Sequence, residues 1–157
     1  MRVSLNDFAR TGALGPVLAG FTPTQREAVF GPPEATGGTS RRRRQPTIWK
    51  YGDIEFHFLW PDGTLCLIHL DRFSGEAGCP VGWGGLEIDP WIIREGLPRD
   101  CFIAALEAEG IQYIIRHEPQ FNHDVLLLPS GVHGSFVLEA QEYSPPVGLA
   151  ALSRRMA

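Results

Sequence analysis

The clearest pattern in the chain is an alternation of apolar and polar residues on both sides of a proline-containing turn. Residues 49–60 (WKYGDIEFHFLW) lead through Pro-Asp-Gly into residues 64–73 (TLCLIHLDRF). A proline, a polar residue and a glycine suit a type I turn that is closed by a left-handed residue. We therefore expect a hairpin with a three-residue loop that pairs Trp60 with Thr64.

This pairing assigns each residue of the hairpin to one of two faces, because side chains alternate along a strand. The first face is apolar and consists of Ile54, Phe56, Phe58, Cys66, Ile68 and Leu70. The second face places Asp53, Glu55, His57 and Leu59 opposite Asp71, His69, Leu67 and Leu65, respectively. A shift of one residue would mix the two sets, so the pattern defines the register.

Three segments carry helix signals. A short helix over residues 4–10 can begin at Ser4 and stop at Gly12. A second helix begins at the sequence TPTQ (22–25), which has the threonine, proline and glutamine of a capping box, and it ends before a Gly-Pro-Pro sequence. A third helix follows Pro98 and ends at Gly110, with an apolar stripe on one side.

The remaining segments are typical of strands and loops. Residues 111–118 predict a strand, and residues 124–140 predict a second hairpin that turns on the sequence LPSGV. Residues 34–46 predict a mobile, solvated loop. The glycine-rich residues 74–90 predict a surface loop with a short strand near residues 86–88.

The order of helix, loop and hairpin occurs twice, at about residues 20–73 and 97–140. It predicts an α+β fold in which two helix-hairpin units share an antiparallel sheet of about five strands, with two or three helices. We expect a single domain over residues 1–145 and a peripheral C-terminal tail over residues 146–157.

Composition and charge narrow the class of protein. The chain has 157 residues, 43% of them hydrophobic, which is enough to bury one core. The formal net charge of −4 gives no general attraction to nucleic acid or to an anionic membrane. No apolar run follows a basic start at the N-terminus, and the three cysteines lack CxxC spacing. We therefore expect a cytoplasmic protein without membrane spans, disulfides or a zinc ribbon.

The order of these motifs resembles a known architecture. A helix that begins with FTPT and ends with FGPP precedes the hairpin sequence YGDIEFHF. This order resembles the helix-hairpin unit of BamE/SmpA-like bacterial proteins, and two such units in tandem are similar to the architecture of the beta-lactamase inhibitory protein. The sequence also looks like small bacterial proteins that are presumed to be toxin-immunity proteins. The resemblance implies a scaffold that binds other proteins and does not catalyse a reaction.

The histidines of the first hairpin suggest an alternative function. In the expected register Glu55 lies opposite His69, and His57 lies diagonal to it, so two imidazoles and a carboxylate could approach one zinc or iron ion. The same residues could equally form a solvated sheet face with a Glu–His cross-strand pair. The solvated face is favoured, because no helix-spaced ligand pair such as HExxH accompanies the cluster.

No other catalytic group stands out in the sequence. Cys66 lies on the apolar face, so its thiol points away from His57 and His69. Cys101 lies at the start of a helix, where a thiolate is favoured, but the sequence places no base beside it. Neither a GxSxG elbow nor a phosphate-binding loop with its lysine is present. We therefore expect a protein that is not an enzyme and that needs no cofactor.

Two loop features could contact a partner. The run Arg41, Arg42, Arg43 and Arg44 could bind an acidic protein surface or a nucleic acid, or it could simply be solvated. Nucleic acid is disfavoured, because the surrounding chain is acidic. Trp83 lies among five glycines and could anchor an interface, or it could fold back over the sheet.

These observations predict a protein-binding module, most concretely an inhibitor or immunity protein that occludes a bacterial toxin. The acidic residues of the first hairpin would form a concave face suited to a basic partner such as a nuclease. A metal-dependent enzyme and a nucleic-acid accessory protein remain the alternatives, and the oligomeric state is left open. The expected partner-binding residues are Asp53, Glu55, His57, His69, Asp71, Trp83, Arg41, Arg42, Arg43 and Arg44.

Overall fold

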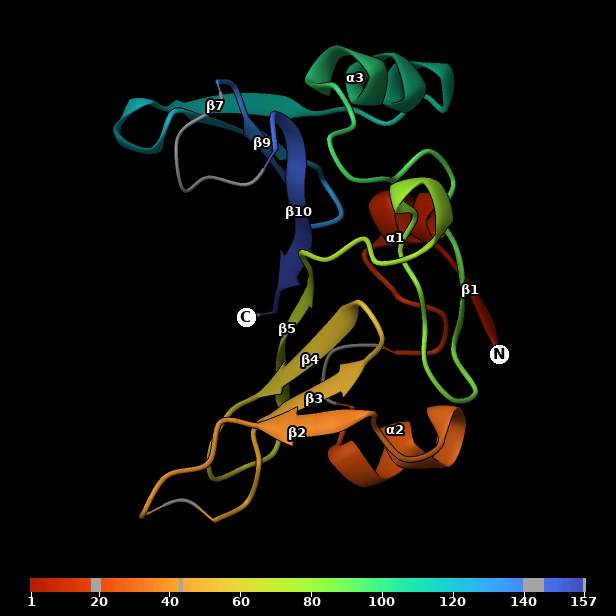
Figure 1. Ribbon diagram of the computed structural model, residues 1–157, viewed down its shortest axis with the longest axis vertical. Coiled ribbons are helices and arrows are strands. Elements are labelled where there is room, and N and C mark those ends of the chain that lie inside the picture. The colour runs from red at the N-terminus through yellow and green to blue at the C-terminus, as the bar shows by residue number, and fades with distance from the viewer. Residues whose placement is uncertain (18–20, 43, 140–145, 157) are drawn as a thin grey trace.

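The computed structural model describes residues 1–17, 21–42, 44–139 and 146–156, and shows an α+β fold (Figure 1). An antiparallel sheet of eight strands forms its centre, and a parallel pair of short strands lies apart from it. The three α-helices of the described chain are α1 (Leu5–Thr11), α2 (Pro23–Phe30) and α3 (Arg99–Ala108). The parallel pair consists of β1 (Arg2–Ser4) and β6 (Glu87–Asp89).

The large sheet contains two runs of four strands that follow α2 and α3, respectively. The first run is β2 (Ala35–Gly37), β3 (Ile48–Tyr51), β4 (Ile54–Phe58) and β5 (Leu65–Leu70). The second run is β7 (Ile114–Glu118), β8 (His123–Leu127), β9 (Val132–Val137) and β10 (Gly148–Arg155). The spatial order is β2-β3-β4-β5-β10-β9-β8-β7, so the last strands of the two runs meet at the centre. The sheet has eight strands where the sequence predicted about five.

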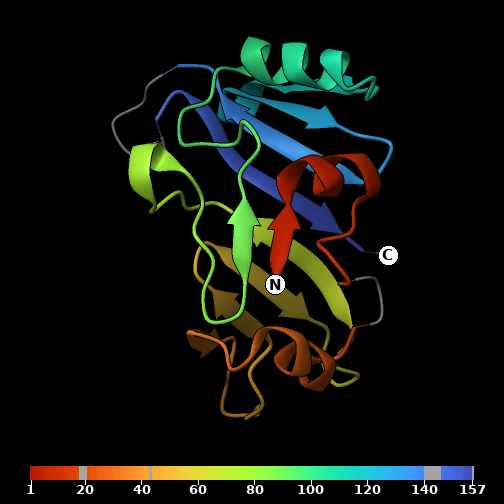
Figure 2. The same cartoon turned by 90° about the vertical axis from the view of Figure 1, so that its right-hand side faces the viewer.

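All three helices and the β1–β6 pair lie on one side of the large sheet (Figures 1 and 2). Their apolar residues form one core with the strand residues that point to that side. Phe8 of α1, Phe30 of α2 and Phe102 of α3 are each at most 2% exposed. Phe30 stacks on Phe56 of β4, and Phe102 contacts Phe136 of β9, so each half of the sheet has a helix against it.

The helix boundaries confirm the sequence signals. Ser4 accepts a hydrogen bond from the backbone of Asp7 and caps α1, which ends at the left-handed Gly12. Thr22 and Gln25 form both hydrogen bonds of the predicted capping box at α2. The predicted short strand near residues 86–88 is β6, and the predicted second hairpin is β8–β9, closed between Leu128 and Val132.

The predicted register of the first hairpin is confirmed over most of its length. Ile54 pairs with Leu70, and His57 pairs with Leu67, as expected. A bulge after His57 then shifts the pairing, so that Phe58 pairs with Leu65. The turn is therefore closed between Leu59 and Thr64, and the predicted pairing of Trp60 with Thr64 is wrong.

The segment 49–60 is not one strand but parts of two. β3 and β4 are joined by the two-residue turn Gly52-Asp53, and Tyr51 pairs with Ile54 across it. Gly52 has a φ of +66°, and a Cβ there would lie 2.2 Å from the backbone oxygen of Val81. The position therefore requires glycine, both for its backbone conformation and for the close approach of the next loop.

The C-terminal segment is not a peripheral tail, because β10 pairs with both β5 and β9 at the centre of the sheet. A bulge between Leu149 and Ala151 places buried leucines at positions 149 and 152, three residues apart. This spacing breaks the two-residue alternation by which a strand is recognised in a sequence. The segment 34–46 also differs from a plain loop, since it contains the edge strand β2.

Candidate functional site

The side of the large sheet that faces away from the helices is the main candidate for a binding surface; we call it the open face. No helix of the described chain covers it (Figure 1). Cross-strand partners point to the same side of a sheet, so the observed registers identify the strand residues that form it. Its main polar and charged residues are Lys50, Glu55, His57, His69, Ser153, Arg155, His133, Ser135, Arg116 and Glu118.

The structure brings three of the predicted residues together on the open face. Nε2 of His57 lies 3.0 Å from Oε2 of Glu55, and the rings of His57 and His69 are 6.4 Å apart, edge to face. Nε2 of His69 also lies 3.5 Å from Oδ2 of Asp71, at the end of β5. All three side chains of the His57–Glu55–His69 group are about a quarter exposed. The predicted cross-strand arrangement of Glu55 and His69 is confirmed.

Asp53 does not belong to this face, contrary to the prediction. It is 3% exposed and its carboxylate accepts hydrogen bonds from the backbone N–H and the hydroxyl of Ser74 and from the backbone N–H of Val81. The cause is the Gly52-Asp53 turn, which turns the residue out of the strand and toward the glycine-rich loop. Asp53 therefore holds a loop in place and is not available to a partner.

The open face is also not acidic, which corrects the expected concave acidic surface. Glu55 lies directly opposite Lys50 on β3 and 3.0 Å from Nε2 of His57, so it does not stand alone on the face. Arg116 and Arg155 add positive charge on the other half of the face. The predicted preference for a basic partner therefore loses its basis.

A shallow hollow of about 380 Å³ lies at the centre of the open face. It spans the β5–β10 junction and reaches β7, and its lining residues are Leu67, His69, Arg116, His133, Ser153 and Arg155. Of these, the sequence singled out only His69. The residues from the second half of the sheet could not be placed beside His69 without knowing that β10 joins β5, because that pairing brings the two halves together.

The pKa of His133 reports the positive charge of the hollow. Partial burial lowers the pKa of His133, and the positive charges of Arg116 and Arg155 lower it further. Both arginines therefore lie close enough to act on the same imidazole. The hollow favours the neutral form of His133 and concentrates positive charge around it.

The two predicted loop features lie away from this hollow. Arg41, Arg42 and Arg44 are exposed in the loop between β2 and β3, and Arg43 lies outside the described residues. Trp83 is 48% exposed, in a loop held to the end of α2 by a 3.0 Å hydrogen bond from Gly85 to Phe30. Neither Trp83 nor the described arginines of the β2–β3 loop line the hollow.

The histidine group does not extend to a metal site. Within the part of the chain that the structure describes, no three His, Cys, Asp or Glu side chains are placed so that they could hold a metal ion. His57 contacts Glu55, and His69 contacts Asp71, so the two histidines belong to two separate pairs. The arrangement is that of histidine–carboxylate pairs on a half-buried sheet face.

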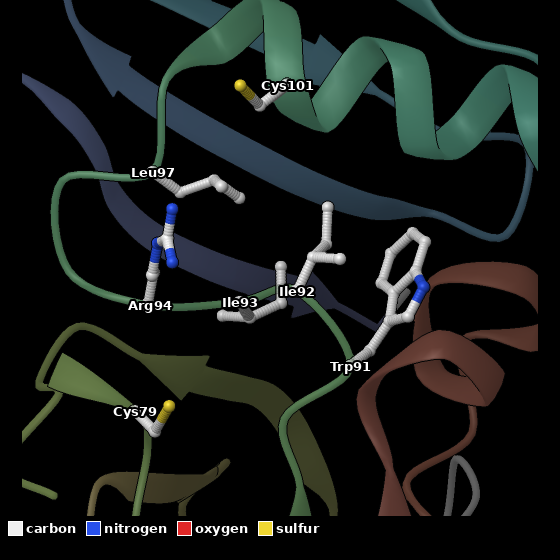
Figure 3. Close-up of a pocket in the computed structure, with 7 residues that line it drawn as sticks. All are labelled: Cys79, Trp91, Ile92, Ile93, Arg94, Leu97 and Cys101. Carbon is white, nitrogen blue, oxygen red and sulfur yellow. The ribbon is translucent and has the colours of Figure 1, made fainter. Parts of the chain in front are cut away.

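A second hollow, of about 330 Å³, lies on the helix side between α3 and the loop that contains Trp91 (Figure 3). Ile92 points toward α3, Leu97 points into the space below Cys101, and Cys79 lies on the opposite side (Figure 3). The described lining residues include two thiols but no histidine or carboxylate that could serve as a base. Cys66, by contrast, lies in the sheet, where burial raises the pKa of its thiol and disfavours the thiolate.

A buried carboxylate joins α3 to the sheet. Asp124 of β8 is 4% exposed, its Oδ1 lies 2.8 Å from Nδ1 of His117, and its Oδ2 accepts a hydrogen bond from Arg99. Burial alone would raise the pKa of Asp124, but the hydrogen bonds and charges of His117 and Arg99 outweigh it and lower the pKa. The contact between Arg99 and Asp124 holds the start of α3 against the second half of the sheet.

This network predicts an acid-dependent loss of stability. A carboxyl group whose pKa is lower in the folded state stabilises the fold above its unfolded pKa, and the contribution is lost as the pH falls through the folded value. We expect the free-energy difference between the wild type and Asp124→Asn to shrink as the pH falls below about 4. Urea unfolding at several pH values measures it. Asp100→Asn, at an exposed partner of the same Arg99, should show little of this dependence.

Comparisons with known proteins identify no relative of this chain. No family model matches the chain, and neither a curated protein nor a solved structure matches it significantly. None of the described helices is both long and apolar enough to span a bilayer.

Proposed function

We propose that the chain is a protein-binding module that uses the open face of its sheet, and that its partner is a bacterial toxin which it inhibits as an immunity protein. The observation that carries the proposal is the one-sided architecture. Eight strands form a continuous surface, all the described helices pack on the other side, and the uncovered side carries polar and charged residues in rigid positions. The cytoplasmic location and the likeness to tandem helix-hairpin inhibitors belong to this proposal.

Exposed apolar side chains at the hairpin ends support it. Phe121, at the β7–β8 turn, is 61% exposed, and Trp60, at the β4–β5 turn, is 48% exposed. In Figure 1 the β7–β8 hairpin and the β2–β3 loop both project to the left, away from the helices. Exposed aromatic side chains are typical anchors of protein interfaces.

The charge of the open face alters the kind of partner that we propose. The central hollow is lined by two arginines and two histidines, so a partner surface that carries acidic residues would complement it better than a basic one. Arg41, Arg42 and Arg44 in the exposed β2–β3 loop have the same preference. The toxin surface in contact with this protein is therefore expected to be acidic.

Site-specific photo-crosslinking in the native cell tests the proposal. A photoreactive amino acid at Ser153, on the open face, should form an adduct with one defined protein, identified by mass spectrometry. The matched control places the same group at Glu27, an exposed residue of α2 on the helix side. Equal adducts at Glu27, or adducts only there, would contradict binding through the open face.

A further inference from the structure

The hollow on the open face has the features of a built anion site. Its residues come from four strands of one sheet, so their backbone positions are rigid relative to one another. His69 pairs with Ser153 on β10, and Ser153 pairs in turn with His133 on β9, which places the three in one row across the sheet. Leu67 pairs with Arg155, one step along the strands.

The positive charge of the hollow is only partly neutralised by its surroundings. None of its described lining residues is an aspartate or a glutamate. Arg116 has one carboxylate partner, Glu118, at 3.0 Å, next to it on the same edge strand. Asp71, which pairs with His69 at 3.5 Å, lies beyond the end of β5. The arginine charges instead act on His133, whose pKa they lower together with burial.

The donors in the hollow match a tetrahedral dianion. Two guanidinium groups offer planar pairs of N–H donors, the Ser153 hydroxyl can donate once, and both imidazoles can donate. A single carboxylate would use only part of this set. The volume of about 380 Å³ exceeds that of a bare phosphate and lies in the range of small-molecule sites.

We propose that this hollow binds a phosphate group, held by Arg116 and Arg155 with Ser153, His69 and His133 as further donors. Leu67 contributes the apolar part of the lining, against which the carbon atoms of a phosphorylated small molecule would lie. The inference goes beyond the protein-binding role and does not depend on it, because it concerns a small ligand and a site complete within this chain.

The test is an NMR titration of the histidine side chains with sodium sulfate, which stays doubly charged over the whole pH range used. A dianion in the hollow should raise the pKa of His133 by about one unit compared with sodium chloride at equal ionic strength. His117 is the internal reference, because it lies on the other side of the sheet with Asp124. Sodium acetate is the third arm and represents a carboxylate ligand.

Variants separate a bound ion from general screening. In Arg155→Gln the pKa of His133 should rise without any added anion, since one positive charge is removed, and sulfate should then have little further effect. Arg42→Gln removes the same charge from the exposed β2–β3 loop and should leave the sulfate response unchanged. An equal response to chloride, or an undiminished sulfate response in Arg155→Gln, would overturn the proposal. An equal or larger response to acetate would overturn the assignment to phosphate.

Discussion

Replacement of Asp53 by alanine is expected to lower the free energy of unfolding by about 3 kcal/mol, because each buried donor left unpaired costs about 1–3 kcal/mol. The carboxylate is 3% exposed and accepts three hydrogen bonds, two from Ser74 and one from Val81, at 2.8–2.9 Å. Alanine leaves those donors without partners in a buried place and loosens the glycine-rich loop from the β3–β4 turn. Urea unfolding followed by circular dichroism measures the loss.

Asp62→Ala is the matched control for this prediction. Asp62 is an exposed residue of the β4–β5 turn, so its removal should change the free energy of unfolding by less than about 0.5 kcal/mol. Asp53→Asn should fall between the two, because the amide keeps an oxygen acceptor but loses the charge. If Asp53→Ala cost no more than Asp62→Ala, the carboxylate would not hold the loop.

Replacement of Arg26 by methionine is expected to stabilise the fold by up to about 2 kcal/mol. Arg26 lies on α2 with no exposed surface, and none of its three side-chain nitrogens has a hydrogen-bond partner among the described residues. Burial lowers the pKa of Arg26 to about 10, although Tyr51 acts in the opposite direction. A shift of that size corresponds to about 3 kcal/mol of cost for burying the charge.

Part of that cost is recovered by aromatic rings, which is why the expected gain is smaller. The guanidinium carbon lies 4.0 Å from the ring centroid of Phe56 and 4.6 Å from that of Phe58. Such cation–π contacts each contribute about 0.5–2 kcal/mol. Methionine fills similar volume without a charge, whereas Arg26→Ala leaves a cavity and should not stabilise. A methionine variant less stable than the wild type would show that the arginine is a net stabilising residue.

Local signals in the sequence predict the local structure well. The capping box at Thr22 and Gln25 and the register of Ile54 with Leu70 both depend on residues close in the chain. The Gly52-Asp53 turn has a signal as well, since Gly-Asp between two alternating runs is typical of a two-residue hairpin. The longer alternation of residues 49–60 obscured it.

The candidate site was predicted only where it depends on one hairpin. Glu55, His57 and His69 lie together as expected, because β4 and β5 are neighbours in sequence and space. Arg155 and His133 were missed because their place depends on the pairing of β10 with β5, more than 80 residues away. No local sequence pattern indicates such a contact, and the bulge in β10 interrupts the apolar–polar alternation by which the strand could have been recognised.

The meeting of β5 and β10 has a consequence for symmetry. Two helix-and-four-strand runs that pair through their last strands, antiparallel, are related by an approximate two-fold axis between those strands. In a homodimer such an axis would place identical side chains on both sides of it. Here one chain supplies both halves, so Glu55 and His57 occupy one side, and His133 and Arg116 occupy the other. The two halves of the open face therefore differ in their side chains, and a partner that lies across it meets a different surface on each side.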